Sequence, residues 1–150
     1  MNNTSDFIVR SSDNKLQLVV EVKTKRGSDS NWAASWRRNL FAHAQIPSAP
    51  YFLLALPDRF YLWKDASIKV VPPDYEVDAK QVLSPYLKEL SVPLDELTEQ
   101  SFELLIRNWL DDVTADHRNS WSKTRATEQL QRSGLYEAIK DGLISTQMAV

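Results

Sequence analysis

Residues 7–27, "FIVRSSDNKLQLVVEVKTKRG", decide the fold of this chain, because two apolar, β-branched runs flank a short polar stretch. Such runs are typical of strands, and the intervening "SSDNK" is rich in turn-forming residues. Residues 6–25 are therefore predicted to form an antiparallel β-hairpin. The second run nevertheless contains Glu21 and Lys23, and charged side chains within an apolar strand call for a physical reason.

The register of this hairpin brings two acidic residues together. Asp6 faces Glu21 if the loop contains two residues, Asp13 and Asn14, or four residues from Ser12 to Lys15. A loop of three residues would shift the register by one and place Asp6 on the opposite face. Side chains that face each other have Cβ atoms about 4.5–5.5 Å apart, and Lys23 shares the face of Glu21 because strand side chains alternate.

An Asp, a Glu and a Lys on one patch predict a divalent metal site. Two carboxylates with room for water suit Mg²⁺ or Mn²⁺, and the ion would relieve the repulsion between Asp6 and Glu21. Such an ion polarises a phosphoryl oxygen, while Lys23 would orient a water molecule or stabilise developing charge. The alternative interpretation is an ion pair between Glu21 and Lys23 at the strand end, with no chemistry.

The remaining sequence predicts one α/β domain over residues 1–150. Gly27 and three polar residues precede a helix over about 30–45, and "PYFLLALPDRFYLWK" predicts two apolar strands around a turn. A strand, a helix and another strand in succession predict a parallel crossover and a mixed sheet. "VPPDYEVD" is interpreted as a connector. Residues 1–71 are thus expected to form the sheet-containing core, and residues 72–150 a helical extension.

The stretch "DFIVRSSDNKLQLVVEVKTK" resembles the active-site hairpin of the PD-(D/E)XK nuclease superfamily, whose fold is called restriction-endonuclease-like. The resemblance covers about residues 5–64, including the crossover helix and the apolar strand after it. It implies that Asp6 and Glu21 bind Mg²⁺ or Mn²⁺ and that Lys23 completes the catalytic set. The superfamily core usually has a helix and a strand before this hairpin, and that helix often carries another acid.

A Mg²⁺-dependent nuclease that acts on DNA is the function expected from this resemblance, and RNA remains an alternative substrate. The second hypothesis is a non-catalytic nucleic-acid-binding or assembly module on the same fold. Candidate phosphate contacts are the basic and polar residues that follow the hairpin: Lys25, Arg26, Arg37, Arg38 and Asn39. The alternative for the three helix residues among them is a solvated helix face.

Charge and composition narrow the class of protein. The net charge is −2, but residues 1–64 contain more basic than acidic side chains and residues 65–150 more acidic than basic ones. Cysteine is absent, which excludes disulfides and thiolate metal sites. No signal peptide or apolar run of about 18 residues is present, so a soluble cytoplasmic protein without membrane contact is expected. A possible homodimer is predicted, because an exposed hairpin edge and the aromatic run "FYLW" need cover.

Overall fold

The computed structural model describes residues 6–146 of the 150-residue chain, so residues 1–5 and 147–150 of the predicted domain lie outside the described part. The strands are β1 (Phe7–Arg10), β2 (Leu16–Val22), β3 (Tyr51–Ala55), β4 (Arg59–Lys64), β5 (Tyr75–Asp78) and β6 (Leu143–Ser145). The helices are α1 (Ser30–His43), α2 (Ala79–Val82), α3 (Ser84–Leu87), α4 (Glu99–Thr114), α5 (Arg125–Arg132) and α6 (Leu135–Ile139), with 3-10 turns η1 (Leu94–Glu96) and η2 (Arg118–Ser120).

The strands form one mixed, six-stranded sheet in the order β5-β4-β3-β2-β1-β6. β1 and β2 are antiparallel, β2 and β3 are parallel across the crossover helix α1, and β3 and β4 are antiparallel. This confirms the α/β class, the mixed sheet and the crossover predicted from the sequence. Because β2 and β3 are parallel, the end of β2 that contains Glu21 lies beside the end of β3 at Leu54.

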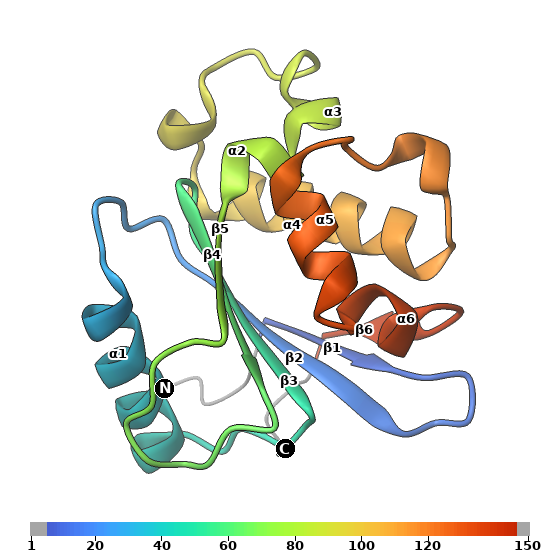
Figure 1. Ribbon diagram of the computed structural model, residues 1–150. Coiled ribbons are helices and arrows are strands. Elements are labelled where there is room, and N and C mark those ends of the chain that lie inside the picture. The colour runs from blue at the N-terminus through green and yellow to red at the C-terminus, as the bar shows by residue number, and fades with distance from the viewer. Residues whose placement is uncertain (1–5, 147–150) are drawn as a thin grey trace.

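Helices cover both faces of the sheet (Figure 1). α1 packs on one face against an apolar cluster that includes Val19, Phe52 and Trp63. The C-terminal helices pack on the other face, where they bury a larger cluster with Leu18 and Val20. The predicted apolar stripe of α4 is buried in this second cluster, which confirms it as core: Phe102, Leu105, Ile106, Trp109, Leu110 and Val113.

The hairpin has the predicted register, but its loop and its second strand differ from the prediction. The loop contains three residues, 12–14, because the Ser11 backbone N–H donates to Lys15 O at 2.8 Å. Both predicted loop lengths, two and four residues, are therefore wrong, and Asn14 closes the three-residue loop in the left-handed conformation, with a φ of 68°. A bulge in β2 at Gln17 then adds one residue opposite β1 and restores the pairing of Phe7 with Val20. Asp6, the next residue, consequently lies opposite Glu21.

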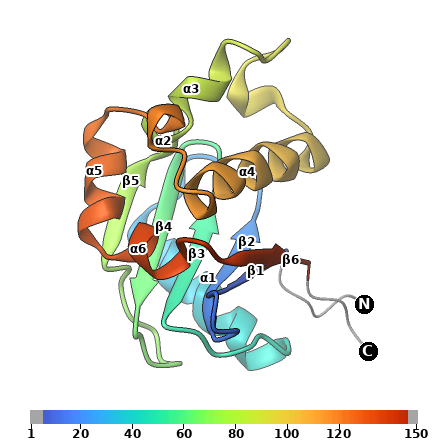
Figure 2. The same ribbon diagram turned by 90° about the vertical axis from the view of Figure 1, so that its right-hand side faces the viewer.

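Two strands occur in the part of the chain that was predicted to be helical or irregular. β5 lies within "VPPDYEVD" and pairs with β4, and β6 pairs with the outer edge of β1 (Figure 2). The prediction of a purely helical extension over residues 72–150 is wrong at these two places. Both strands are short edge strands, and three or four residues give little periodic signal in the sequence.

The features that predicted a homodimer are covered within the chain itself. β6 occupies the free edge of β1, and the aromatic run of β4, residues 60–63, is at most 1% exposed. The stated reasons for self-association are therefore wrong. None of the helices formed by residues 6–146 is long and apolar enough to cross a membrane.

Candidate active site

Asp6 and Glu21 meet at one end of the sheet and bond to each other's backbone. Asp6 directly precedes β1, and its backbone N–H donates to Glu21 Oε2 at 3.0 Å. The Val22 backbone N–H donates in turn to Asp6 Oδ2 at 2.7 Å. These bonds engage one oxygen of each carboxylate, while Asp6 Oδ1 and Glu21 Oε1 take no part in them. The two strand ends are thus tied together through the two carboxyl groups.

Burial gives this pair unusual acidities. Glu21 is only 4% exposed to solvent. Burial, and then the negative charge of Asp6, raise the pKa of Glu21 to about 8. Burial also raises the pKa of Asp6, although the hydrogen bond from Val22 and the positive charge of Lys23 oppose the shift. The folded protein therefore resists the presence of two negative charges at this position.

Lys23 and Glu103 complete the neighbourhood of the pair. Lys23 follows β2 directly, and its backbone N–H donates to Ala55 O at 3.1 Å. Its side chain is half-buried, and its charge acts on Asp6, Glu21 and Glu103. Glu103 extends from α4, where burial and then the charge of Asp6 raise its pKa. The structure therefore brings together the three predicted residues and adds a third carboxyl group.

The sequence did not predict Glu103 as part of the site, because the residues that it meets in the fold, such as Asp6, are remote from it in the sequence. It lies beside Phe102 on a helix whose apolar stripe predicts only a core position. A half-buried glutamate on the border of such a stripe is a weak signal by itself. Its meeting with Asp6 depends on how α4 crosses the sheet, which no local pattern encodes.

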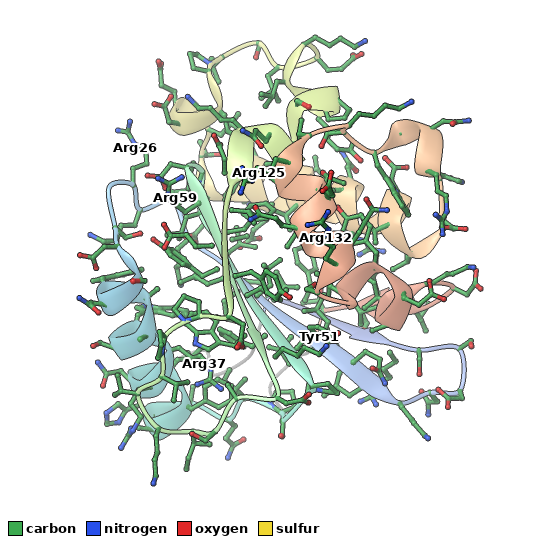
Figure 3. The ribbon with its side chains drawn as sticks, in the orientation of Figure 1. Arg26, Arg37, Tyr51, Arg59, Arg125 and Arg132 are labelled. Atoms are coloured by element: carbon green, nitrogen blue, oxygen red, sulfur yellow. The ribbon has the colours of Figure 1, made fainter. Side chains whose placement is uncertain are left out.

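The loop after β2 is fixed by contacts to other parts of the chain. The Gly27 backbone N–H donates to Asp58 Oδ2 at 2.9 Å, and Gly27 has a φ of 73°, which favours glycine. Arg26, labelled in Figure 3, forms an ion pair with Asp95 at 2.9 Å. Lys25 lies over the ring of Trp32, 5.1 Å from its centroid. The exposed basic residues Lys25 and Arg26 are thus held at the same end of the sheet as Glu21.

The three predicted phosphate contacts on α1 separate into two groups. Arg38 and Asn39 are exposed. Arg37 is only 4% exposed and donates hydrogen bonds to the backbone oxygens of Ala66 and Ser67. Arg37 therefore does not lie on the exposed face of α1 with Arg38 and Asn39, and its contact with phosphate stays a prediction. Helical spacing places it on the inner face of α1 with the buried Ala33 and Ala34.

The donor chemistry at this site suits a hard cation, with Asp6 and Glu21 as the groups that would hold it. Mg²⁺ prefers oxygen ligands and is commonly bound by one or two carboxylates, with water molecules at the other positions. The raised pKa values of the two carboxyl groups are consistent with such an ion, although Asp6 also shares a hydrogen bond with the Glu103 side chain. A cage made by protein side chains alone is not present, since residues 6–146 contain no group of three or more His, Cys, Asp or Glu arranged for a metal.

Comparison with known proteins adds no relative: no protein-family model, curated protein or solved structure matches this chain. The fold and site define an α/β protein with a mixed sheet and an acidic pair, one buried glutamate and one half-buried aspartate, beside a lysine. Its function must therefore be argued from the chemistry of that site.

Proposed function

We propose that this chain is a Mg²⁺- or Mn²⁺-dependent nuclease that acts on DNA and that its sheet is of the restriction-endonuclease-like type. The observation that carries the proposal is the reciprocal pairing of Asp6 and Glu21 at a strand end, with Lys23 beside them. The order of antiparallel hairpin, crossover helix and parallel strand supports it. Glu103 supports it further, because the superfamily often has another helix-borne acid, although here that acid lies after the hairpin.

Each residue has a separate role in the proposed hydrolysis. Asp6 and Glu21 would hold the cation, which supplies Lewis-acid polarisation of a phosphoryl oxygen when bound. Lys23 orients the attacking water molecule and compensates the negative charge that develops on the phosphate. Water adds to phosphorus, one ester P–O bond breaks, and the released sugar oxygen takes up a proton.

The loop after β2 is the proposed contact to the nucleic-acid backbone. Lys25 and Arg26 are exposed near the acidic pair and held by Trp32 and Asp95. Basic side chains in this position provide sequence-independent attraction to phosphates. The ion pair of Arg26 with Asp95 competes with phosphate, whereas Lys25 belongs to none of the ion pairs found within residues 6–146.

A cleavage assay with labelled DNA tests the proposal. Wild-type protein is expected to cleave DNA with Mg²⁺ or Mn²⁺ and to lose activity with EDTA, while Asp6→Asn and Lys23→Ala both abolish cleavage. Lys23→Ala should retain metal binding, measured as a metal-dependent rise in melting temperature, whereas Asp6→Asn should lose it. Lys88→Ala, which changes an exposed lysine outside the site, is the matched control. RNA of the same sequence, tested in parallel, identifies the preferred substrate.

The second candidate function is a non-catalytic nucleic-acid-binding or assembly module. One observation favours it: each carboxylate already accepts a backbone hydrogen bond, so Asp6 and Glu21 have a structural use. This candidate predicts DNA binding that is independent of metal and lost in Lys25→Ala, with no cleavage under any condition. Fluorescence anisotropy with labelled DNA separates the two candidates, and absence of both binding and cleavage would exclude the nuclease and the nucleic-acid-binding module and leave the assembly module.

A further inference from the structure

A cavity of about 240 Å³ lies between α1 and the segment that joins β4 to β5. It is at the opposite end of β3 from the acidic pair, because it is lined by Pro50 and Tyr51, whereas Glu21 pairs with Leu54. The lining is mainly apolar and includes Phe41, Ile46, Phe52 and Trp63. Ile68 also lines it and is 71% exposed, so the cavity is open to solvent at this residue.

Arg37 is the one charged side chain among the described residues that line this cavity. Figure 3 shows it between α1 and the connection from β4 to β5. The centre of its guanidinium lies 4.8 Å from the ring centroid of Phe41, 5.7 Å from Phe52 and 5.4 Å from Trp63. The cation is therefore held among aromatic rings, an arrangement that stabilises its charge in part.

The hydrogen-bonding capacity and charge of Arg37 are only partly satisfied within the chain. A guanidinium has five N–H donors, and Arg37 donates to Ser67 O at 2.8 Å and to Ala66 O at 3.4 Å. Its Nε is buried and has no hydrogen-bond partner. None of the ion pairs found within residues 6–146 includes Arg37. A buried cation without an anionic partner is costly.

The acidic residue whose charge reaches Arg37 forms no ion pair with it. Asp74 acts on Arg37 only at a distance, and its Oδ2 accepts the Lys64 backbone N–H at 2.7 Å. A bound anion would therefore supply the charge that the chain itself does not place against Arg37. A single cation in an apolar lining suits a monoanion with an apolar body.

We propose that this cavity binds a small apolar carboxylate. Its carboxylate contacts the guanidinium of Arg37, and its hydrocarbon or aromatic body lies against Phe41, Ile46 and Trp63. The cavity is smaller than the roughly 300–1,000 Å³ typical of sites for drug-sized ligands, which limits the occupant to a compact molecule. The site is independent of the proposed nuclease function, because it shares no residue with the acidic pair.

Calorimetry with three probes of one shape tests the proposal on the full chain. 4-Phenylbutyrate is expected to bind about tenfold or more tightly than 4-phenylbutyramide, because the carboxylate forms charge-assisted bonds to Arg37. 4-Phenylbutylamine is expected not to bind. The Trp63 indole N–H donates to Val71 O at 3.0 Å, and its NMR resonance should shift with 4-phenylbutyrate. Absence of binding, or equal affinity for acid and amide, would overturn the proposal.

Two variants locate the effect at Arg37. Arg37→Met should reduce the preference for acid over amide to within about twofold, since Met keeps contacts to the rings without the charge. Arg38→Met, at the exposed neighbouring position, should retain the full preference. If Arg37→Met does not fold by circular dichroism, Ala49→Phe fills the cavity while Arg37 remains, and 4-phenylbutyrate binding should be lost. Retained preference in folded Arg37→Met, or retained binding in Ala49→Phe, would contradict the assignment.

Discussion

Replacing Glu21 by Gln should make the protein more stable at high pH. The pKa of Glu21 is raised from 4.5 to about 8 in the folded protein. The folded state therefore holds a proton that the unfolded state releases, and the free energy of unfolding falls as pH rises between these two values. At about 1.4 kcal/mol per pKa unit, ionisation of this buried side chain costs the folded state at most roughly 5 kcal/mol. Gln carries no charge, and its amide oxygen can still accept the Asp6 N–H.

Urea unfolding at a series of pH values measures this difference. With EDTA present, wild type and Glu21→Gln should have similar free energies of unfolding near pH 4.5, and the variant should be more stable by about 2–5 kcal/mol near pH 8.5. Subtracting the two curves removes the titration of groups that do not interact with Glu21. Glu89→Gln, at an exposed position, should follow the wild-type curve.

The metal hypothesis predicts a second pH dependence of stability, with the opposite sign. A cation must displace protons from the carboxyl groups, so stabilisation by Mg²⁺ should grow with pH in wild type and be absent in Glu21→Gln. Saturation at one hundred times the Kd would contribute about 2.7 kcal/mol. A difference between wild type and variant that does not change with pH would refute the reasoning about burial. A variant that is less stable at high pH would show that Glu21 acts as an ordinary structural partner.

Three further outcomes are expected. Glu103→Ala should raise the pKa of Asp6 further, because it removes the Glu103 hydrogen bond that lowers this pKa, and should weaken metal-dependent thermal stabilisation without abolishing it, as measured by NMR titration and thermal unfolding. Gly27→Ala should reduce the free energy of unfolding by about 1–2 kcal/mol in urea, because the added methyl group meets no atom within 4 Å but the φ of 73° strains the backbone. Removal of residues 141–150 uncovers the edge of β1 and should produce self-association, detected by light scattering, whereas the full chain remains monomeric at the same concentration.

The hairpin and the crossover could be predicted because local pattern determines them. The β-branched runs, the turn residues and the polar cap of α1 each encode their own structure, and the Asp29 side chain indeed accepts the Trp32 N–H at 2.8 Å. The loop length was harder to predict. The three-residue loop closed by Asn14 shifts the register by one residue, and the bulge at Gln17 shifts it back. Register was thus predicted correctly while both turn details were not.

The rest of the candidate site depends on contacts between distant segments. Glu103 reaches Asp6 only because α4 packs across the sheet, and nothing near either residue in the sequence indicates this. Arg37 directly precedes the exposed Arg38, so the sequence suggests that both lie on a basic surface. The position of each residue around the helix axis instead buries Arg37 and exposes Arg38. β6 escapes prediction because its three residues follow a helix and are ordered by β1 rather than by their own propensity.

The pairing of β6 with β1 also sets the order in which this sheet can be finished during synthesis. The first strand of the described chain obtains its outer neighbour only when the last strand has left the ribosome. Until then the nascent hairpin presents an unpaired edge, and closure requires contact between segments that are remote in sequence, which slows folding. Pulse-labelling by hydrogen exchange should find the β1–β6 hydrogen bonds protected after those of β2 with β3. The last described strand, β6, thus protects the strand that begins beside the acidic pair.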